Sequence, residues 1–135
     1  MNKPECTTYP NGSKDWYLNG MLHREDGPAV EWANGTKEWR LNGKRHREDG
    51  PASEWANGNK VWWLNGELHR EDGPACEYAD GSKEWWLNNK EVDPETIVDL
   101  WLAKNIYCFY NRETTVWSLT KRKQGSSHFT KINKK

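Results

Sequence analysis

The sequence predicts a mainly β protein, a meander of repeated antiparallel β-hairpins, with a small α+β cap at its C-terminal end. The heptapeptide His-Arg-Glu-Asp-Gly-Pro-Ala occurs three times, beginning at His23, His46 and His69, with a period of 23 residues. Asn-Gly pairs, which strongly favour hairpin turns, recur in the same frame. The chain also has 10 tryptophans, most of them in this frame. Because one repeat cannot bury its own apolar face, we expect the copies to stack into a continuous array.

The repeat frame sets the expected organisation of the chain. A length of 135 residues predicts one domain. Residues 1–8 lead into the repeats, 9–92 hold three complete copies and a partial fourth, 93–120 form a C-terminal cap, and 121–135 form a flexible basic tail. The copies span 9–31, 32–54, 55–77 and 78–92.

Within a repeat we expect about two short antiparallel strands. In the second copy, Asn34-Gly35 and Asn42-Gly43 each fit a two-residue type I′ turn, which needs positive φ at both residues. The second turn would set His46 across from Trp39. The first turn would place one set of side chains on one face, namely Val30, Trp32, Lys37, Trp39 and Leu41, and leave Glu31, Ala33, Glu38 and Arg40 on the other.

Two rows of aromatic residues follow the 23-residue period. Both rows are expected on the same sheet face, where they would form a ladder that stabilises the array. At about 4.8 Å per strand, equivalent residues of successive copies lie about 10 Å apart. The first row is Tyr9, Trp32, Trp55 and Tyr78, and the second is Trp16, Trp39, Trp62 and Trp85.

After Val92 the sequence changes to a helical pattern. Asp93 fits an N-cap and Pro94 the first helical position, and an apolar stripe continues to Lys104. We expect this helix to lie over the end of the sheet, followed by strands at 106–110 and 114–120 with a turn at 111–113.

Charge and composition limit the classes of partner. The net charge is zero, but residues 1–120 carry −6 and the tail +6. No run of 18 apolar residues occurs, and we expect no signal peptide and no membrane contact. The cysteines Cys6, Cys76 and Cys108 show no C-x-x-C spacing, which favours free thiols in the cytoplasm.

The Trp, Asn-Gly and His frame, as in Glu38-Trp39, Asn42-Gly43 and His46, resembles the MORN (membrane occupation and recognition nexus) repeat. The resemblance covers residues 9–92 and implies an elongated, curled sheet used for binding, without chemistry. The family usually continues with His-Gly-x-Gly, whereas this chain has His-Arg-Glu-Asp-Gly-Pro-Ala. That variant is similar to repeats in uncharacterised phage and giant-virus proteins, which implies a viral source and the host cytoplasm as location.

The heptapeptide supplies metal-ligand residue types, but a structural role fits better. Copies about 10 Å apart cannot share an ion that needs bonds near 2.0–2.3 Å. We expect Arg24 or Arg47 to bridge carboxylates of the adjacent repeat, and Asp26 or Asp49 to bond turn amides. No distinct nucleophile accompanies the histidines, because Cys76 fits an inward position. We therefore expect no enzyme activity, no cofactor and no metal.

The candidate binding residues are those that differ between copies. Structural positions should be uniform, and two positions on opposite sides of the second turn are not. We expect them to face away from the aromatic ladder, with Trp63, Trp86 and Leu68 in an exposed apolar patch, unless the C-terminal helix covers it. The first position is Tyr17, Arg40, Trp63 and Trp86, and the second is Leu22, Arg45, Leu68 and Glu91.

This patch favours a non-catalytic binding protein with a protein partner, which for a phage-encoded protein would be a host factor such as a defence protein. An alternative is sequestration of a nucleotide-type small ligand in an aromatic groove, with Arg24, Arg47 and Arg70 on phosphate. A further alternative is nucleic-acid binding through the basic tail, against which the acidic repeat body argues.

Overall fold

The computed structural model describes residues 2–113, 115–121 and 127–133, with side chains over residues 2–105. The chain forms two compact units, Met1–Val92 and Asp93–Lys135. The boundary between the units lies where the sequence predicts the end of the repeats, at residue 92.

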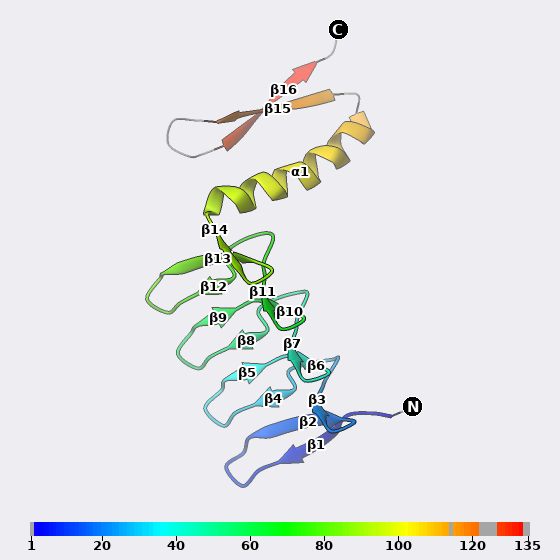
Figure 1. Ribbon diagram of the computed structural model, residues 1–135, viewed down its shortest axis with the longest axis vertical. Coiled ribbons are helices and arrows are strands. Elements are labelled where there is room, and N and C mark those ends of the chain that lie inside the picture. Colours follow the sequence, from blue (N-terminus) through cyan, green and yellow to red (C-terminus); the bar gives the residue numbers. More distant parts are fainter. Residues whose placement is uncertain (1, 114, 122–126, 134–135) are drawn as a thin grey trace. The chain divides into compact units, whose positions relative to one another are not determined.

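The first unit is built on one antiparallel sheet of short strands, as the fold class predicts (Figure 1). Each complete repeat contributes two strands to it, and β3 (Met21–Leu22) pairs with one end of β2. The main path runs through β1 (Glu5–Thr8), β2 (Lys14–Leu18), β4 (Val30–Glu31), β5 (Lys37–Glu38), β8 (Ser53–Glu54), β9 (Lys60–Val61), β12 (Cys76–Glu77), β13 (Lys83–Leu87) and β14 (Lys90–Val92).

A second row of hairpins lies beside this sheet in Figure 1. Two of them form separate two-stranded sheets, β6 (Arg40–Leu41) with β7 (Lys44–Arg45), and β10 (Trp63–Leu64) with β11 (Glu67–Leu68). Backbone bonds join successive hairpins: the Gly43 amide donates to the Leu22 carbonyl at 2.9 Å, and the Gly66 amide to the Arg45 carbonyl at 2.8 Å. Neighbouring repeats are thus hydrogen-bonded along both rows.

The first turn of each repeat differs from the expected one. Trp32 donates its amide to the Thr36 carbonyl, and Val30 pairs with Glu38, so the loop has three residues rather than two. Gly35 alone takes positive φ, at 92°, as in a type I turn followed by a G1 bulge. The extra residue moves the register by one and exchanges the faces. Glu38 therefore shares a face with Val30, not with Glu31 as expected.

The second turn is the predicted two-residue type I′ turn. Asn42 and Gly43 have φ of 50° and 80°, and Arg40 pairs with Arg45. The His46 amide donates to the Trp39 carbonyl, as expected. The same geometry recurs in the other copies, including the fourth, where Asn88 and Asn89 have φ of 48° and 62°.

Small residues, not the aromatic rows, form the most buried part of the sheet. Ala29, Ala52 and Ala75 are fully buried, and the next residue of each copy is buried as well. Tryptophans of the second row are only half-buried, and Trp32 and Trp55 of the first row are 40% and 38% exposed. The expected ladder of two interleaved rows on one face is therefore wrong.

The second unit contains α1 (Pro94–Glu113), β15 (Thr115–Lys121) and β16 (Ser127–Asn133). Asp93 caps the helix as predicted, since its side chain accepts from the Thr96 amide at 2.9 Å. The helix continues to Glu113, so the expected strand at 106–110 is wrong: Ile106–Tyr110 prolongs the helical register instead of leaving it.

The strand expected at 114–120 is confirmed as β15, which pairs antiparallel with β16. Residues 127–133, which we expected within a flexible tail, thus form a strand because β15 offers its backbone as a partner. That this unit covers the end of the repeat sheet stays a prediction.

Candidate binding grooves between the repeat corners

The three heptapeptides, residues 23–29, 46–52 and 69–75, form equivalent segments that we call corners. In the middle corner the Arg47 guanidinium lies 3.9 Å from the centre of the Trp39 ring. Its other side faces Gly50, where an added Cβ would lie 2.9 Å from Arg47 Cζ. The arginine is therefore held between an aromatic ring and bare backbone. The outer corners repeat this arrangement with Arg24 on Trp16 and Arg70 on Trp62, each at 3.9 Å.

Carboxylates and a carbonyl fix the same arginine from its edge. Arg47 Nε donates to Asp49 at 2.9 Å, and Arg47 Nη1 donates to the Pro51 carbonyl at 3.1 Å and to Glu54 at 3.4 Å. All these partners belong to the same repeat, so the expected bridge to the adjacent repeat is wrong. The hydrogen bond and charge of Arg47 lower the pKa of the Asp49 carboxyl, and Arg24 lowers the pKa of Asp26 in the same way.

Each corner histidine connects its repeat to the next one. His46 Nδ1 accepts a hydrogen bond from the Asn65 backbone amide at 3.0 Å, and His23 accepts from the Asn42 amide at the same distance. An accepting Nδ1 places the ring proton on Nε2. In His46 this Nε2 points to Glu48 at 3.7 Å. The histidines are therefore structural links between copies.

Successive corners enclose two equivalent open grooves. The first, between corners 23–29 and 46–52, has a volume of about 730 Å³. The second, between corners 46–52 and 69–75, has a volume of about 640 Å³. Trp39 and Leu41 line the first, and Trp62 and Leu64, one repeat later, line the second. Each groove thus has an apolar floor.

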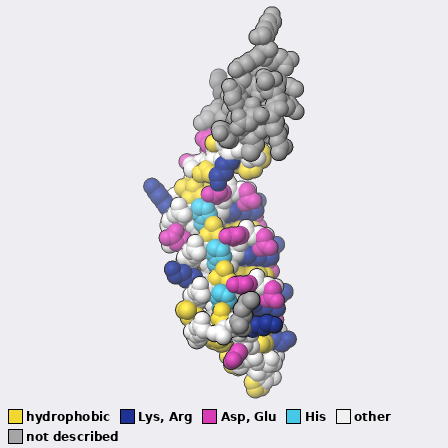
Figure 2. Space-filling view, turned by 90° about the vertical axis from the view of Figure 1, so that its right-hand side faces the viewer, with side chains coloured by type: hydrophobic (Ala, Val, Ile, Leu, Met, Phe, Trp, Pro, Cys, Tyr) yellow, Lys and Arg dark blue, Asp and Glu magenta, His cyan; other side chains and the backbone are white. Residues whose placement is uncertain are grey.

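The groove rims are acidic. Two arginines and four carboxylates line each groove, so each carries a net charge of −2 with neutral histidine. Figure 2 shows the histidines as a column on this face, with acidic side chains along one side of the column. The side chains of Glu25 and Glu48 are 83% and 84% exposed, and those of Asp26 and Asp49 are 87% and 86% exposed.

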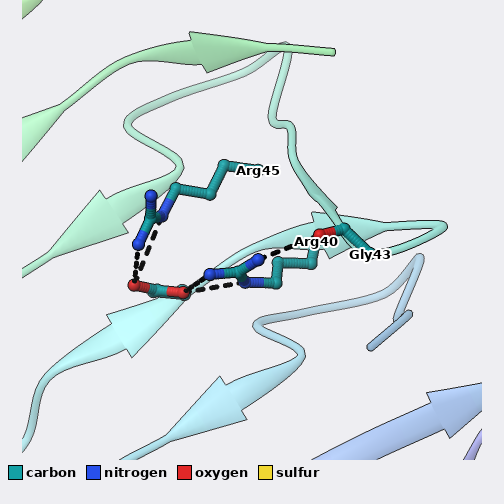
Figure 3. A network of polar contacts seen from close by, with 4 residues as sticks. Arg40, Gly43 and Arg45 are labelled. Carbon is teal, nitrogen blue, oxygen red and sulfur yellow. Dashed lines mark hydrogen bonds and ion pairs between the residues drawn. The ribbon is translucent and has the colours of Figure 1, made fainter. Parts of the chain in front are cut away.

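The variable residues of the second repeat form an internal ion cluster. Figure 3 shows Arg40 and Arg45 converging on one carboxylate, and their ion pairs identify it as that of Glu38. Glu38 is only 6% exposed. Arg40 Nη2 lies 2.7 Å from Glu38 Oε2, and Arg45 Nη2 lies 3.0 Å from Oε1. Arg40 Nη1 also donates to the Gly43 carbonyl at 2.9 Å. Arg40 is therefore packed against its own repeat, not outward as expected.

The equivalent residues of the other repeats are packed in a similar way. Trp63 pairs in register with Leu68, and both are half-buried. Trp86 is half-buried too, and its Nε1 donates to Glu84 at 3.1 Å. Tyr17 is 37% exposed and pairs with Leu22. The predicted pairing across the turn is confirmed, whereas Trp63, Trp86 and Leu68 are half-buried rather than fully exposed as expected.

The predicted site residues thus divide into two groups. The corner arginines Arg24, Arg47 and Arg70 line the grooves, whereas the residues around the second turn support the hairpins. Sequence reasoning missed the groove floor, since Leu41 and Leu64 are uniform between copies and only the positions that differ are singled out as candidates. A third position also differs between copies, with Glu38 in the second repeat and Val61 in the third. Sequence reasoning missed it because the expected register placed Glu38 on the sheet face opposite Val30.

The described side chains, residues 2–105, include no cluster of three or more His, Cys, Asp or Glu side chains suited to a metal ion. Cys76 is 3% exposed, and burial raises the pKa of its thiol. It occupies the inward position that the repeat alignment predicts. Among the described residues, no helix is long and apolar enough to cross a membrane.

The fold and the grooves define a repeat protein of antiparallel β-hairpins with two equivalent grooves, each of net negative charge. Comparison with protein-family models, with curated proteins and with solved structures gives no match for this chain.

Proposed function

We propose that this chain is a non-catalytic binding protein of MORN-like repeats, whose corner grooves hold a protein partner. The observation that carries the proposal is the repetition of the groove: two hollows of about 730 and 640 Å³ lie one repeat apart, each with an apolar floor and a charged rim. Equivalent sites in a regular row suit an elongated partner that contacts successive repeats. The resemblance of the heptapeptide to viral repeats makes a host protein, such as a defence factor, the partner to test first.

The corner arginines favour this proposal over a nucleotide-type ligand. Arg47 already stacks on Trp39 and bonds Asp49, so a phosphate would compete with a carboxylate in a groove of negative charge. That competition disfavours phosphate. A protein segment that packs on Leu41 and Leu64 does not have to displace a carboxylate from an arginine.

The test is affinity capture from host lysate with the full chain and two variants. Leu41→Asn/Leu64→Asn places amides on the groove floors, and Trp32→Ala/Trp55→Ala alters an exposed aromatic row outside the groove linings. We expect the unmodified chain and the Trp variant to capture the same protein, and the Leu variant to lose it. Thermal melts establish that both variants are folded. Capture that survives the Leu substitutions would contradict binding in the grooves.

A further inference from the structure

We propose that the grooves select a basic, polyproline-II-like segment of the partner, with Lys or Arg at every third residue. This inference rests on the proposed function and names the chemistry of the segment that the grooves accept. It follows from three properties of the grooved face: its charge, the distance between grooves and the apolar floor.

The charge favours a cationic segment. Each groove has a net charge of −2, and its two arginines are stacked on tryptophans and bonded to carboxylates. Glu25 and Glu48 point outward at the groove rims with most of their side chains exposed. An incoming guanidinium or ammonium group therefore meets exposed carboxylates at the groove rims, which favours association with basic partners.

The distance between grooves selects the spacing and conformation of that segment. Two strands of the main sheet separate equivalent residues, which corresponds to about 10 Å. A polyproline II helix rises about 3.1 Å per residue with three residues per turn, so every third side chain returns to the same side after about 9.3 Å. A β-strand would place every third side chain on the opposite side. The array thus fits the polyproline II period.

The floor accommodates the stems of long basic side chains. Trp39 with Leu41, and Trp62 with Leu64, lie beneath the acidic rims. Lys and Arg can pack their methylene groups on such a floor while the charged head reaches a rim carboxylate. Each groove therefore offers both parts of a basic side chain a suitable contact.

The test uses two labelled peptides of the same composition, four Arg and eight Pro. In one, Arg is every third residue; in the other, the arginines are grouped in adjacent pairs. Fluorescence anisotropy with the full chain at low salt should show the periodic peptide binding about fivefold more tightly, because only it places a cation at successive grooves. Equal affinity for the two peptides, or no binding of either, would overturn the proposal.

A matched pair of variants locates the contact. Glu25→Gln/Glu48→Gln removes two rim charges, and Glu5→Gln/Glu91→Gln removes two exposed charges of the same unit outside the grooves. The rim variant should bind the periodic peptide about fivefold more weakly, as expected for two lost exposed ion pairs, and the control should match the unmodified chain. Equal weakening of both variants would show attraction by net charge alone and overturn the proposal.

The two proposals can fail separately. If neither peptide binds but the captured host protein still depends on Leu41 and Leu64, the grooves bind a partner of different chemistry and only the present inference is wrong. If the variant with Leu41→Asn/Leu64→Asn also captures the host protein as well as the unmodified chain does, the proposed function is wrong too.

Discussion

Arg47 lies with its guanidinium carbon 3.9 Å from the centre of the Trp39 ring, and the opposite face of the guanidinium meets the backbone of Gly50. The arrangement explains three fixed residues of the repeat at once. Tryptophan supplies the platform, arginine covers it, and glycine leaves room for the arginine. A cation over an aromatic ring contributes about 0.5–1 kcal/mol at an exposed site, and this chain has three such pairs between Arg and Trp in its corners.

Substitution Gly50→Ala should destabilise the protein by about 1 kcal/mol, although Gly→Ala at an unstrained site usually stabilises by about 0.4–1 kcal/mol. The reason is space, since the new Cβ would lie 2.9 Å from Arg47 Cζ and would displace the guanidinium from Trp39. Urea unfolding measures the change. The control is the same substitution in an Arg47→Ala background, where it should be neutral or stabilising. A loss of stability that persists in this background would contradict the steric explanation.

Acid should weaken the corners. The bond and charge of Arg47 lower the pKa of Asp49 in the folded protein, so the ionised carboxylate stabilises the fold above the unfolded-state pKa near 3.8. That contribution is lost as the pH falls through the lower, folded pKa. Asp26→Asn/Asp49→Asn should therefore lower the Tm at pH 6, with the difference from the unmodified protein shrinking below about pH 3. Thermal melts from pH 2 to 6 test this, and a difference independent of pH would contradict it.

The ion cluster of the second repeat should behave as one unit. Glu38→Val alone leaves Arg40 and Arg45 beside a buried apolar side chain and should cost about 2–3 kcal/mol, somewhat less than for a fully buried pair. Adding Arg40→Trp and Arg45→Leu recreates the set Val61, Trp63 and Leu68 of the third repeat. The triple variant should return to within about 1 kcal/mol of the original stability in urea unfolding. A triple variant as unstable as Glu38→Val would show that the repeats are not equivalent.

Ser53→Cys should stabilise the fold by about 1 kcal/mol. Ser53 is fully buried, and its hydroxyl has no hydrogen-bond partner in the described part of the chain. Cysteine, found at the equivalent position 76, fills a similar volume with a less polar atom. Urea unfolding under reducing conditions measures the gain, and Ser13→Cys serves as a control, because the Ser13 hydroxyl accepts from the Ala33 amide at 3.0 Å. A loss of stability in Ser53→Cys would contradict the explanation that the Ser53 hydroxyl is buried without a hydrogen-bond partner.

The repeat period, the strand class and the second turn could be predicted because they depend on local chemistry. Two adjacent positive-φ residues define the Asn42-Gly43 turn wherever it occurs. The Asn34-Gly35 pair is compatible with both a two-residue and a three-residue loop. The observed three-residue loop is held by a bond within the turn, from the Thr36 amide to Asn34 Oδ1 at 2.9 Å, and by a bond to the next copy, from the Ala56 amide to Thr36 Oγ1 at 3.1 Å. The Asn-Gly pair alone does not specify these bonds.

That single residue of register explains the misplaced candidate site. In the observed register, Arg40 pairs with Glu38 instead of facing solvent. The residues that differ between repeats therefore represent alternative packing of the same position. Variation between copies thus reflected compensated packing. The grooves, in contrast, are formed by segments one repeat apart and could be found only once the stacking of the corners was known.

The corrected register gives a direct test with three tryptophans. Trp62 is half-buried under Arg70, and Trp63 is half-buried with a solvent-inaccessible indole nitrogen, whereas Trp32 is 40% exposed. Truncation of a fully buried tryptophan to alanine lowers the free energy of unfolding by about 3–5 kcal/mol, and truncation of a partly buried one lowers it by less. We therefore expect Trp62→Ala and Trp63→Ala to cost similar amounts, about 2–3 kcal/mol each, and Trp32→Ala less than about 1 kcal/mol. Urea unfolding of the three variants ranks them in one experiment. If Trp63→Ala were as mild as Trp32→Ala, the indole of Trp63 would lie outside the packed hairpin, and the two-residue register of the first turn would have to be restored.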